Sequence, residues 1–278
     1  MKIYKTKSEI IIEKEGEYFI SAETDWDVFI DRDDLYVQVQ KEIFGLEAAG
    51  DAAWLHEKEL LAPIGSQEVW AAGVTYLRSK VARMEESKES GGATFYDKVY
   101  DAERPELFFK STAGRVVAPH GKVRIRKDSS WDVPEPELVL VIASSGKIIG
   151  YSIGNDMSSR SIEGENPLYL PQAKMYDGCA AVGPCVLVTE EPIAPATTIA
   201  ITIERLGKIV FEGSVTIDQM KRKHTELVAF LYKEYSFATG AYLMTGTCVV
   251  PDNNFTLQSG DIITISIEGI GVLVNTVA

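Results

Sequence analysis

The chain has 278 residues, of which 45% are hydrophobic and 25% are charged, a composition that excludes a disordered or fibrous protein. Its formal net charge of −13 repels phosphate backbones and anionic lipid headgroups, which argues against nucleic-acid and membrane partners. No segment has the character of a signal peptide or of a membrane span, which needs about 20 apolar residues. We interpret Cys179, Cys185 and Cys248 as reduced core thiols and expect a cytoplasmic protein.

The N-terminal part of the chain, residues 1–63, alternates apolar and polar residues in short pieces. This pattern predicts a small β-rich domain with a short helix around residues 48–61. The strands of this domain are expected near residues 10–14, 18–21, 27–30 and 35–39.

The remaining residues, 64–278, form longer β-branched stretches separated by Gly, Pro and Asp. They predict a second, larger domain whose strands close or roll on themselves, so we expect a mainly β fold of the α+β class. Its strands are expected within residues 68–76, 106–111, 122–126, 137–142, 147–154, 181–188, 198–206 and 262–274. Helices are expected at residues 78–89 and 224–235.

Two glutamates, Glu135 and Glu137, stand at the leading edge of an apolar run. A strand would point both side chains to one face, about 7 Å apart, close enough for two carboxylates to converge on one ion. Asp156 follows 19 residues after Glu137, and Lys174 follows 18 residues after Asp156. These four residues could build a single metal site. Glu-x-Glu alone is explained equally well by a charged strand end that faces water.

The sequence around these four residues resembles the fumarylacetoacetate hydrolase superfamily over most of the chain. The stretch GYSIGNDMSSR at 150–160 is similar to the signature Gly-Tyr-x-x-x-Asn-Asp-x-Ser-x-Arg. The stretch KMYDGCAAVGP at 174–184 is similar to Lys-x-x-Asp-Gly-x-x-x-x-Gly-Pro. The TGT at 245–247 and the run GDIITISIEGIGVLVNTV at 260–277 resemble the closing pattern of the family.

This resemblance implies a mixed β-roll catalytic domain preceded by a small N-terminal module, assembled as a homodimer or homotetramer. It implies Glu135, Glu137 and Asp156 as ligands of Mg²⁺, with Mn²⁺ or Ca²⁺ as alternatives. It also implies Lys174 as a catalytic residue that supports the substrate.

Three carboxylates suit a hard cation and leave open positions in its octahedral shell. A 2-oxo acid can fill those positions through its carboxylate and adjacent carbonyl, and the ion then stabilises the enolate that forms when a neighbouring proton leaves. Lys174 would add a positive charge beside the same oxygens. The metal and the lysine therefore predict a 2-oxo acid substrate and leave the final reaction open.

The sequence departs from the hydrolases of the superfamily at the groups that activate water. Those enzymes commonly carry Asn-Tyr-x-x-His-x-x-Glu, whereas Ser79 and Ala82 stand at the His and Glu positions here. The gap between Glu137 and Asp156 is also short by comparison. Together these differences resemble the sugar-acid branch, the dehydratases of 2-keto-3-deoxyarabinonate.

We therefore predict a Mg²⁺-dependent lyase that dehydrates a 2-keto-3-deoxy sugar acid, most simply a pentonate, to a dioxo acid. One alternative is an acylpyruvate or fumarylacetoacetate hydrolase, or an oxaloacetate decarboxylase, on the same scaffold. Another is a metal-free member that binds sugar acids without catalysis.

The predicted base that removes the C3 proton is Glu106, with Glu86 as the alternative. His120 and His224 are weaker candidates, for which surface or capping roles are expected. The predicted substrate contacts are Ser79, Lys110, Arg160, Asp177 and Thr245.

Three of these contacts have a second interpretation. Arg160 is as well placed to hold the loop of Asp156, and Asp177 is expected to orient Lys174 or its turn. Thr245 and Thr247 resemble the contact that the family makes with the substrate carboxylate, and a β-turn is the alternative.

Overall fold

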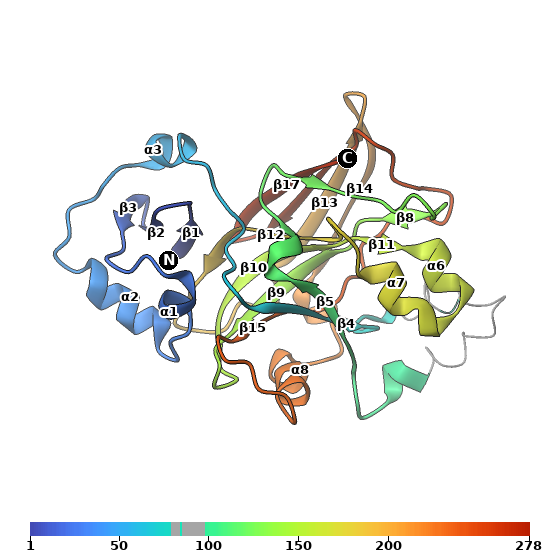
Figure 1. The fold of residues 1–278 in the computed structure, drawn as a ribbon, viewed down its shortest axis with the longest axis horizontal. Coiled ribbons are helices and arrows are strands. Elements are labelled where there is room, and N and C mark those ends of the chain that lie inside the picture. The colour runs from blue at the N-terminus through green and yellow to red at the C-terminus, as the bar shows by residue number, and fades with distance from the viewer. Residues whose placement is uncertain (79–83, 85–97) are drawn as a thin grey trace.

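The computed structural model describes residues 1–78, 84 and 98–278, and two β-sheets dominate it (Figure 1). The larger sheet has the strand order β3-β2-β1-β12-β10-β9-β15-β4-β5, and β6 (Val116–Val117) pairs with β12 beside it. In that order its strands are Glu17–Ile20, Ile10–Lys14, Lys2–Lys5, Ala180–Leu187, Ile148–Asp156, Pro136–Ile142, Ala241–Met244, Glu68–Gly73 and Glu106–Thr112.

The second sheet has the order β14-β13-β16-β17-β7. Its strands in that order are Lys208–Thr216, Thr198–Arg205, Ile262–Ile267, Gly271–Val277 and Lys122–Val123. A short pair, β8 (Asp132–Val133) and β11 (Ser158–Ser159), lies apart from both sheets. This strand-rich arrangement confirms the predicted fold class, although the strand predicted at 122–126 is only two residues long.

Strand β9 is buried along its whole length because its two faces pack against different layers. Leu138 and Leu140 belong to the core that includes Ile201 and other residues of the second sheet. Val139 belongs to the core on the opposite face, which also contains Phe29 of the N-terminal module. Glu137 alternates with Leu138 and so shares the face of Val139.

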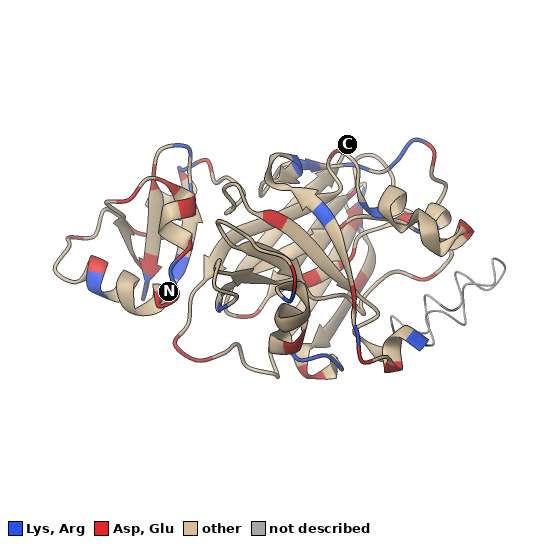
Figure 2. Cartoon of the chain, turned by 60° about the horizontal axis from the view of Figure 1, so that its bottom comes forward, with Lys and Arg blue, Asp and Glu red and all other residues tan. Residues whose placement is uncertain are grey.

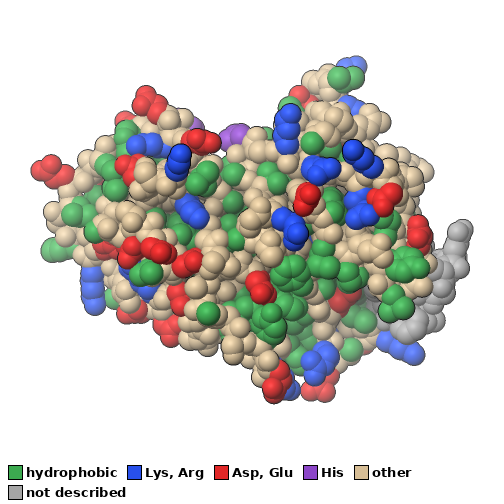
Figure 3. Space-filling model, in the orientation of Figure 1, with side chains coloured by type: hydrophobic (Ala, Val, Ile, Leu, Met, Phe, Trp, Pro, Cys, Tyr) green, Lys and Arg blue, Asp and Glu red, His purple; other side chains and the backbone are tan. Residues whose placement is uncertain are grey.

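The N-terminal module, residues 1–63, lies at one end of the molecule, on the left in Figures 1 and 2. Its strands extend the larger sheet, because β1 pairs with β12 through Lys2↔Leu187 and Ile3↔Val186. The module carries fifteen acidic and seven basic residues, so most of the net negative charge lies there. Acidic side chains are prominent on its visible face in Figure 3. The domain boundary at residue 63 stays a prediction.

Two segments of this module were predicted as strands, and that prediction is wrong. Residues 27–30 lie in α1 (Trp26–Ile30), because the Asp25 side chain accepts hydrogen bonds from the backbone N–H groups of the first turn. Residues 35–39 lie in α2 (Leu35–Ile43), whose buried residues follow the i, i+4 spacing of a helix.

The remaining helices are short. Helix α3 (Ala52–His56) lies within the predicted range, and α8 (His224–Leu231) confirms the start of the helix predicted at 224–235. Helices α6 (Arg160–Glu165) and α7 (Leu170–Lys174) were not predicted and follow the end of β10. The helix predicted at 78–89 lies mostly outside the described residues. None of the described helices is long and apolar enough to cross a membrane.

Candidate active site and metal centre

Three buried carboxylates meet where β9 begins and β10 ends. Glu135 directly precedes β9, Glu137 lies within it, and Asp156 is the last residue of β10. The strands are antiparallel, with Gly154 opposite Glu137, and the Asp156 N–H donates to the Glu135 carbonyl at 2.9 Å. One oxygen from each of the three carboxylates lies within 4.8 Å of the others. The antiparallel pairing therefore brings together the three acids that the sequence predicted to converge.

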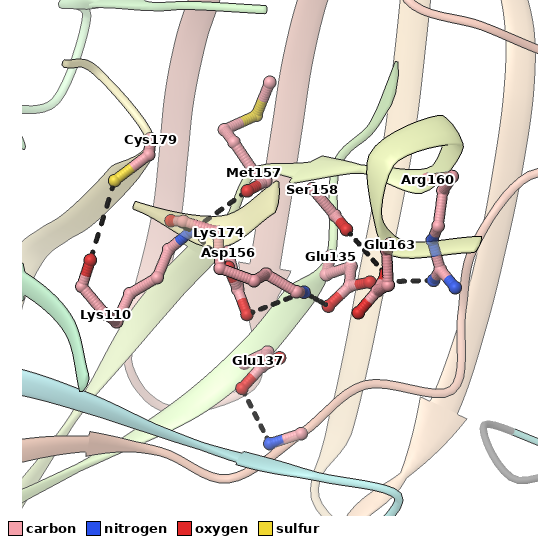
Figure 4. A network of polar contacts seen from close by, with 11 residues as sticks. Lys110, Glu135, Glu137, Asp156, Met157, Ser158, Arg160, Glu163, Lys174 and Cys179 are labelled. Atoms are coloured by element: carbon pink, nitrogen blue, oxygen red, sulfur yellow. Dashed lines mark hydrogen bonds and ion pairs between the residues drawn. The ribbon is translucent and has the colours of Figure 1, made fainter. Parts of the chain in front are cut away.

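Three buried cations surround these acids (Figure 4). Lys174 Nζ, at the end of α7, lies 2.6 Å from Glu135 Oε2 and 3.0 Å from Asp156 Oδ2. Arg160 Nη2, at the start of α6, lies 2.7 Å from Glu135 Oε1. Lys110 Nζ, on β5, lies 2.5 Å from Asp156 Oδ1. A fourth buried carboxylate, Glu163, lies in the same network and accepts a hydrogen bond from the Ser158 hydroxyl at 3.2 Å (Figure 4).

Glu137 is the carboxylate whose protonation the surroundings alter most clearly. Burial raises its pKa well above the usual range, and the negative charges of Asp156 and Glu135 raise it further. Lys174 and a hydrogen bond from the Gly246 N–H to Glu137 Oε2, at 2.6 Å, act in the opposite direction. A positive charge placed among these acids would relieve the repulsion between them.

The donor set suits a magnesium ion. Magnesium prefers carboxylate oxygens in octahedral geometry and keeps part of its shell for water or substrate. Glu135, Glu137 and Asp156 supply three such oxygens and no nitrogen or sulfur ligand. They are therefore the residues that would hold the ion.

A cavity opens onto this cluster. Its lining includes the three acids with Lys174 and Arg160, and the other lining residues are largely apolar. Those other residues are Ala72, Gly73, Val74, Arg78, Phe108, Gly246, Thr247, Cys248 and Val250. A small anion that reaches the acids would therefore meet Lys174 and Arg160 as well as apolar side chains.

The structure brings only some of the predicted substrate contacts to this cavity. Lys174 and Arg160 line it. Lys110 does not line it, because its ammonium lies behind Asp156. The Asp177 side chain is 75% exposed and lies near Arg115 and Arg124, so it orients neither Lys174 nor a ligand in the cavity.

Thr245 is also directed away from the cavity. Its hydroxyl donates to the Leu138 carbonyl at 2.9 Å, and it is Thr247, two residues further on, that lines the cavity. Ser79 and Glu86 lie outside the described residues. Neither His120 nor His224 lines the cavity.

Glu106, the preferred base, is the first residue of β5 and pairs with Gly73 of β4. Gly73 lines the cavity, and the Glu106 carboxylate packs against it. Glu106 therefore lies beside the cavity wall.

The sequence did not single out several residues that the structure places at the cavity. Arg78 and Phe108 line the cavity, whereas in their segments the sequence had suggested only other residues as site candidates. Gly246 has a φ of +98°, which favours glycine, and this conformation directs its N–H at Glu137. The sequence shows a glycine between two threonines, but only the fold shows that its N–H donates to Glu137.

Comparison with known proteins agrees with this geometry. The family model for the C-terminal part of fumarylacetoacetate hydrolase matches residues 69–278. A probable 2-keto-3-deoxyxylonate dehydratase of Haloferax volcanii is 47% identical over 222 residues, which cover 80% of this chain and 75% of the relative. The 2-dehydro-3-deoxy-D-arabinonate dehydratase of Saccharolobus solfataricus is 42% identical over 228 residues, covering 80% and 76%.

A solved structure of 2-keto-3-deoxy-D-arabinonate dehydratase, complexed with magnesium and 2,5-dioxopentanoate, has the same fold. It aligns with a TM-score of 0.85 at 34% identity and covers 100% of this chain and 98% of that chain. The predicted mixed β-roll is thereby confirmed. The chain belongs to the fumarylacetoacetate hydrolase family.

Proposed function

We propose that this protein is a Mg²⁺-dependent dehydratase that removes water from a 2-keto-3-deoxypentonate and yields a dioxo acid. The observation that carries the proposal is the cluster of Glu135, Glu137 and Asp156, whose oxygens approach within 4.8 Å beside Lys174 at the cavity. Relatives that are 42% and 47% identical bear the names of dehydratases of such acids, which supports the same reaction here.

The charges of the cluster suit a substrate that becomes doubly negative during the reaction. Lys110, Arg160 and Lys174 each form an ion pair with Glu135 or Asp156. Magnesium, when bound, supplies a Lewis acid for the carbonyl of a 2-oxo acid and adds two positive charges. A 2-oxo acid brings one negative charge and gains a second as its C3 proton leaves, and the two positive charges of a bound Mg²⁺ would offset both. The positively charged side chains of Lys174 and Arg160 then lie beside the developing negative charge.

The proton transfers fall to residues along the cavity. Glu106 is our candidate to take the C3 proton, because its carboxylate lies against Gly73 of the cavity wall. The electron pair of the C3–H bond forms a C3=C4 bond, and the C4 hydroxyl leaves with a proton as water. Two hydrogens then move from C5 and its hydroxyl to C3 and C4, which gives an aldehyde at C5. The atoms balance as one pentonate to one dioxo acid and one water.

A substrate comparison tests this function. Purified protein with Mg²⁺ is incubated separately with a 2-keto-3-deoxypentonate, an acylpyruvate and oxaloacetate, and the products are identified by mass spectrometry. Loss of one water from the pentonate is expected. Turnover of the acylpyruvate or oxaloacetate alone would instead indicate the hydrolase or decarboxylase alternative.

Metal binding separates an enzyme from a protein that only binds sugar acids. Titration calorimetry with Mg²⁺ is expected to detect binding to the parent protein and to lose it in Glu137→Ala. Glu190→Ala, on the surface, is the matched control and should bind the ion as the parent does. Sugar-acid binding that needs no metal would contradict the enzymatic proposal.

We further propose a homodimer that forms through the outer face of the second sheet. This outer face consists of the residues of β13, β16 and β17 that alternate with the buried ones. They are Thr198, Ala200, Thr202, Glu204, Ile262, Thr264, Ser266, Val272, Val274 and Thr276. This set contains one acidic and no basic residue. Two copies of this strongly negative chain would therefore repel each other little through this face.

The compartment proposed is the cytoplasm. Cys179, Cys185 and Cys248 are all buried and free, as expected where thiols stay reduced.

A further inference from the structure

All contacts of the Lys110 ammonium group described below are with oxygen atoms of the protein itself. The residue is completely buried on β5, and its Nζ lies 2.5 Å from Asp156 Oδ1 (Figure 4). The same nitrogen donates to the Met157 carbonyl at 2.9 Å and to the Lys174 carbonyl at 2.5 Å. A lysine ammonium has three donors. Two of them go to these carbonyls and Asp156 Oδ1 faces the nitrogen as an ion pair, so protein oxygens enclose the ammonium.

We infer that Lys110 is a positioning residue. It fixes two parts of the active site, the Asp156 carboxylate and the end of α7 at Lys174, without lining the cavity. The inference rests on the proposed function in so far as Asp156 is taken as a metal ligand. Lys110 holds Asp156 Oδ1, which leaves Oδ2 as the oxygen directed at Lys174. Polar and charged partners of ligating carboxylates orient them in this way and tune their affinity for the ion.

The second part is the end of α7. By accepting from Lys110, the Lys174 carbonyl ties the backbone of that helix end to β5. The Lys174 side chain starts from this fixed point and reaches Glu135 and Asp156. Lys110 therefore sets the position of one metal ligand and of the lysine beside the substrate without contacting either the ion or the substrate.

The geometry explains why a lysine is required at this position. Asp156 Oδ1 and the two carbonyl oxygens surround one nitrogen atom, which suits the compact ammonium group. A guanidinium is planar and spreads its donors over three nitrogens in a fixed fork, so no single nitrogen could face all three oxygens. An arginine would therefore keep the charge of residue 110 and lose its geometry.

The experiment measures metal affinity in the absence of substrate. Mn²⁺ binding is followed by electron paramagnetic resonance in the parent and in Lys110→Met, Lys110→Arg and Lys110→Gln. The Kd for Mn²⁺ is expected to rise by about tenfold to a hundredfold in Lys110→Met and in Lys110→Arg, as for other residues that support metal ligands. Lys110→Gln keeps an amide that can donate to the carbonyls, and it should fall between these variants and the parent. Lys147→Met, exposed on the surface, is the control and should bind as the parent does.

Steady-state kinetics provide the second readout. At saturating metal, kcat should fall in Lys110→Met while the KM for the pentonate stays close to that of the parent. Unchanged Mn²⁺ affinity together with a raised KM would make Lys110 a substrate contact and overturn the inference. If Lys110→Met does not fold, Lys110→Gln and Lys110→Arg decide between these outcomes. A parent protein that binds no Mn²⁺ would overturn the metal site itself, which distinguishes failure of the proposed function from failure of this inference alone.

Discussion

The carboxylate of Glu106 lies so close to Gly73 that a Cβ on residue 73 would come within 2.0 Å of Glu106 Oε2. The two residues face each other across β4 and β5. Since Gly73 also lines the cavity, the missing side chain at residue 73 lets the carboxylate lie against the cavity wall.

This relationship predicts that Gly73→Ala acts through Glu106. The added methyl group must displace the carboxylate, which is the flexible end of a side chain, so the melting temperature should change little. If Glu106 takes the C3 proton, kcat should fall by about a hundredfold to ten-thousandfold in Gly73→Ala and in Glu106→Gln. Turnover of the pentonate and thermal unfolding are the measurements.

A matched control is available in Gly114→Ala, because a Cβ there meets no atom within 4 Å. This variant should keep both activity and stability. Full activity in Gly73→Ala would show that the position of the Glu106 carboxylate does not matter, and another base would have to be sought.

The cluster of three acids could be predicted from the sequence because local rules place its members. Alternation along a strand puts Glu135 and Glu137 on one face, and the family signature supplies Asp156. The predicted convergence of all three depends on the antiparallel pairing of β9 with β10, which the sequence did not predict.

The substrate contacts could not be predicted in the same way, because each depends on which way one side chain turns after the chain has folded. Lys110 and Thr245 are directed at backbone carbonyls that come from distant segments. The helices α1 and α2 were missed for a related reason. Their short apolar segments are compatible with both a strand and a helix. The Asp25 cap favours the helix in α1, and the burial of one helical face favours it in α2.

Two threonines of the same motif give a paired prediction. The Thr245 hydroxyl donates to the Leu138 carbonyl, so Thr245→Val should lower the free energy of unfolding by about 1 kcal/mol and leave KM unchanged. Thr247 lines the cavity, so Thr247→Val should raise the KM for the pentonate by about tenfold through one lost hydrogen bond. Denaturant unfolding and steady-state kinetics on both variants provide the test. The reverse pattern would assign the substrate contact to Thr245, as the sequence alone suggested.

The stability of the protein should depend on the protonation of His224. Burial lowers the pKa of His224 to about 4, and its Nε2 has no hydrogen-bond partner in the described part of the chain. The unfolded chain has the ordinary histidine pKa of about 6.5, so between pH 6.5 and 4 the unfolded state binds the proton more readily. The contribution of His224 to stability is therefore complete above pH 6.5 and is lost as the pH falls toward 4.

The variant His224→Gln tests this dependence. Between pH 7 and pH 5 the parent should lose about 2 kcal/mol more unfolding free energy than His224→Gln, as judged by urea unfolding at each pH. His56→Gln, on the surface, controls for removal of a histidine as such and should follow the parent. Parallel curves for the parent and His224→Gln would contradict the prediction.

The outer face of the second sheet predicts how the oligomer can be broken. In a dimer with twofold symmetry the same patch of both copies meets, so a lysine added to one chain is added twice to a single interface. Val272 is 48% exposed on this face, and Thr264 lies on the neighbouring strand. The variants Val272→Lys and Thr264→Lys should therefore shift the protein from dimer to monomer in sedimentation velocity. Their circular dichroism should be unchanged because both side chains already face outward.

Val37→Lys is the control, since Val37 on α2 is 44% exposed and lies in the N-terminal module. A parent protein that sediments as a monomer, or a dimer that survives both substitutions, would exclude this face as the contact between copies.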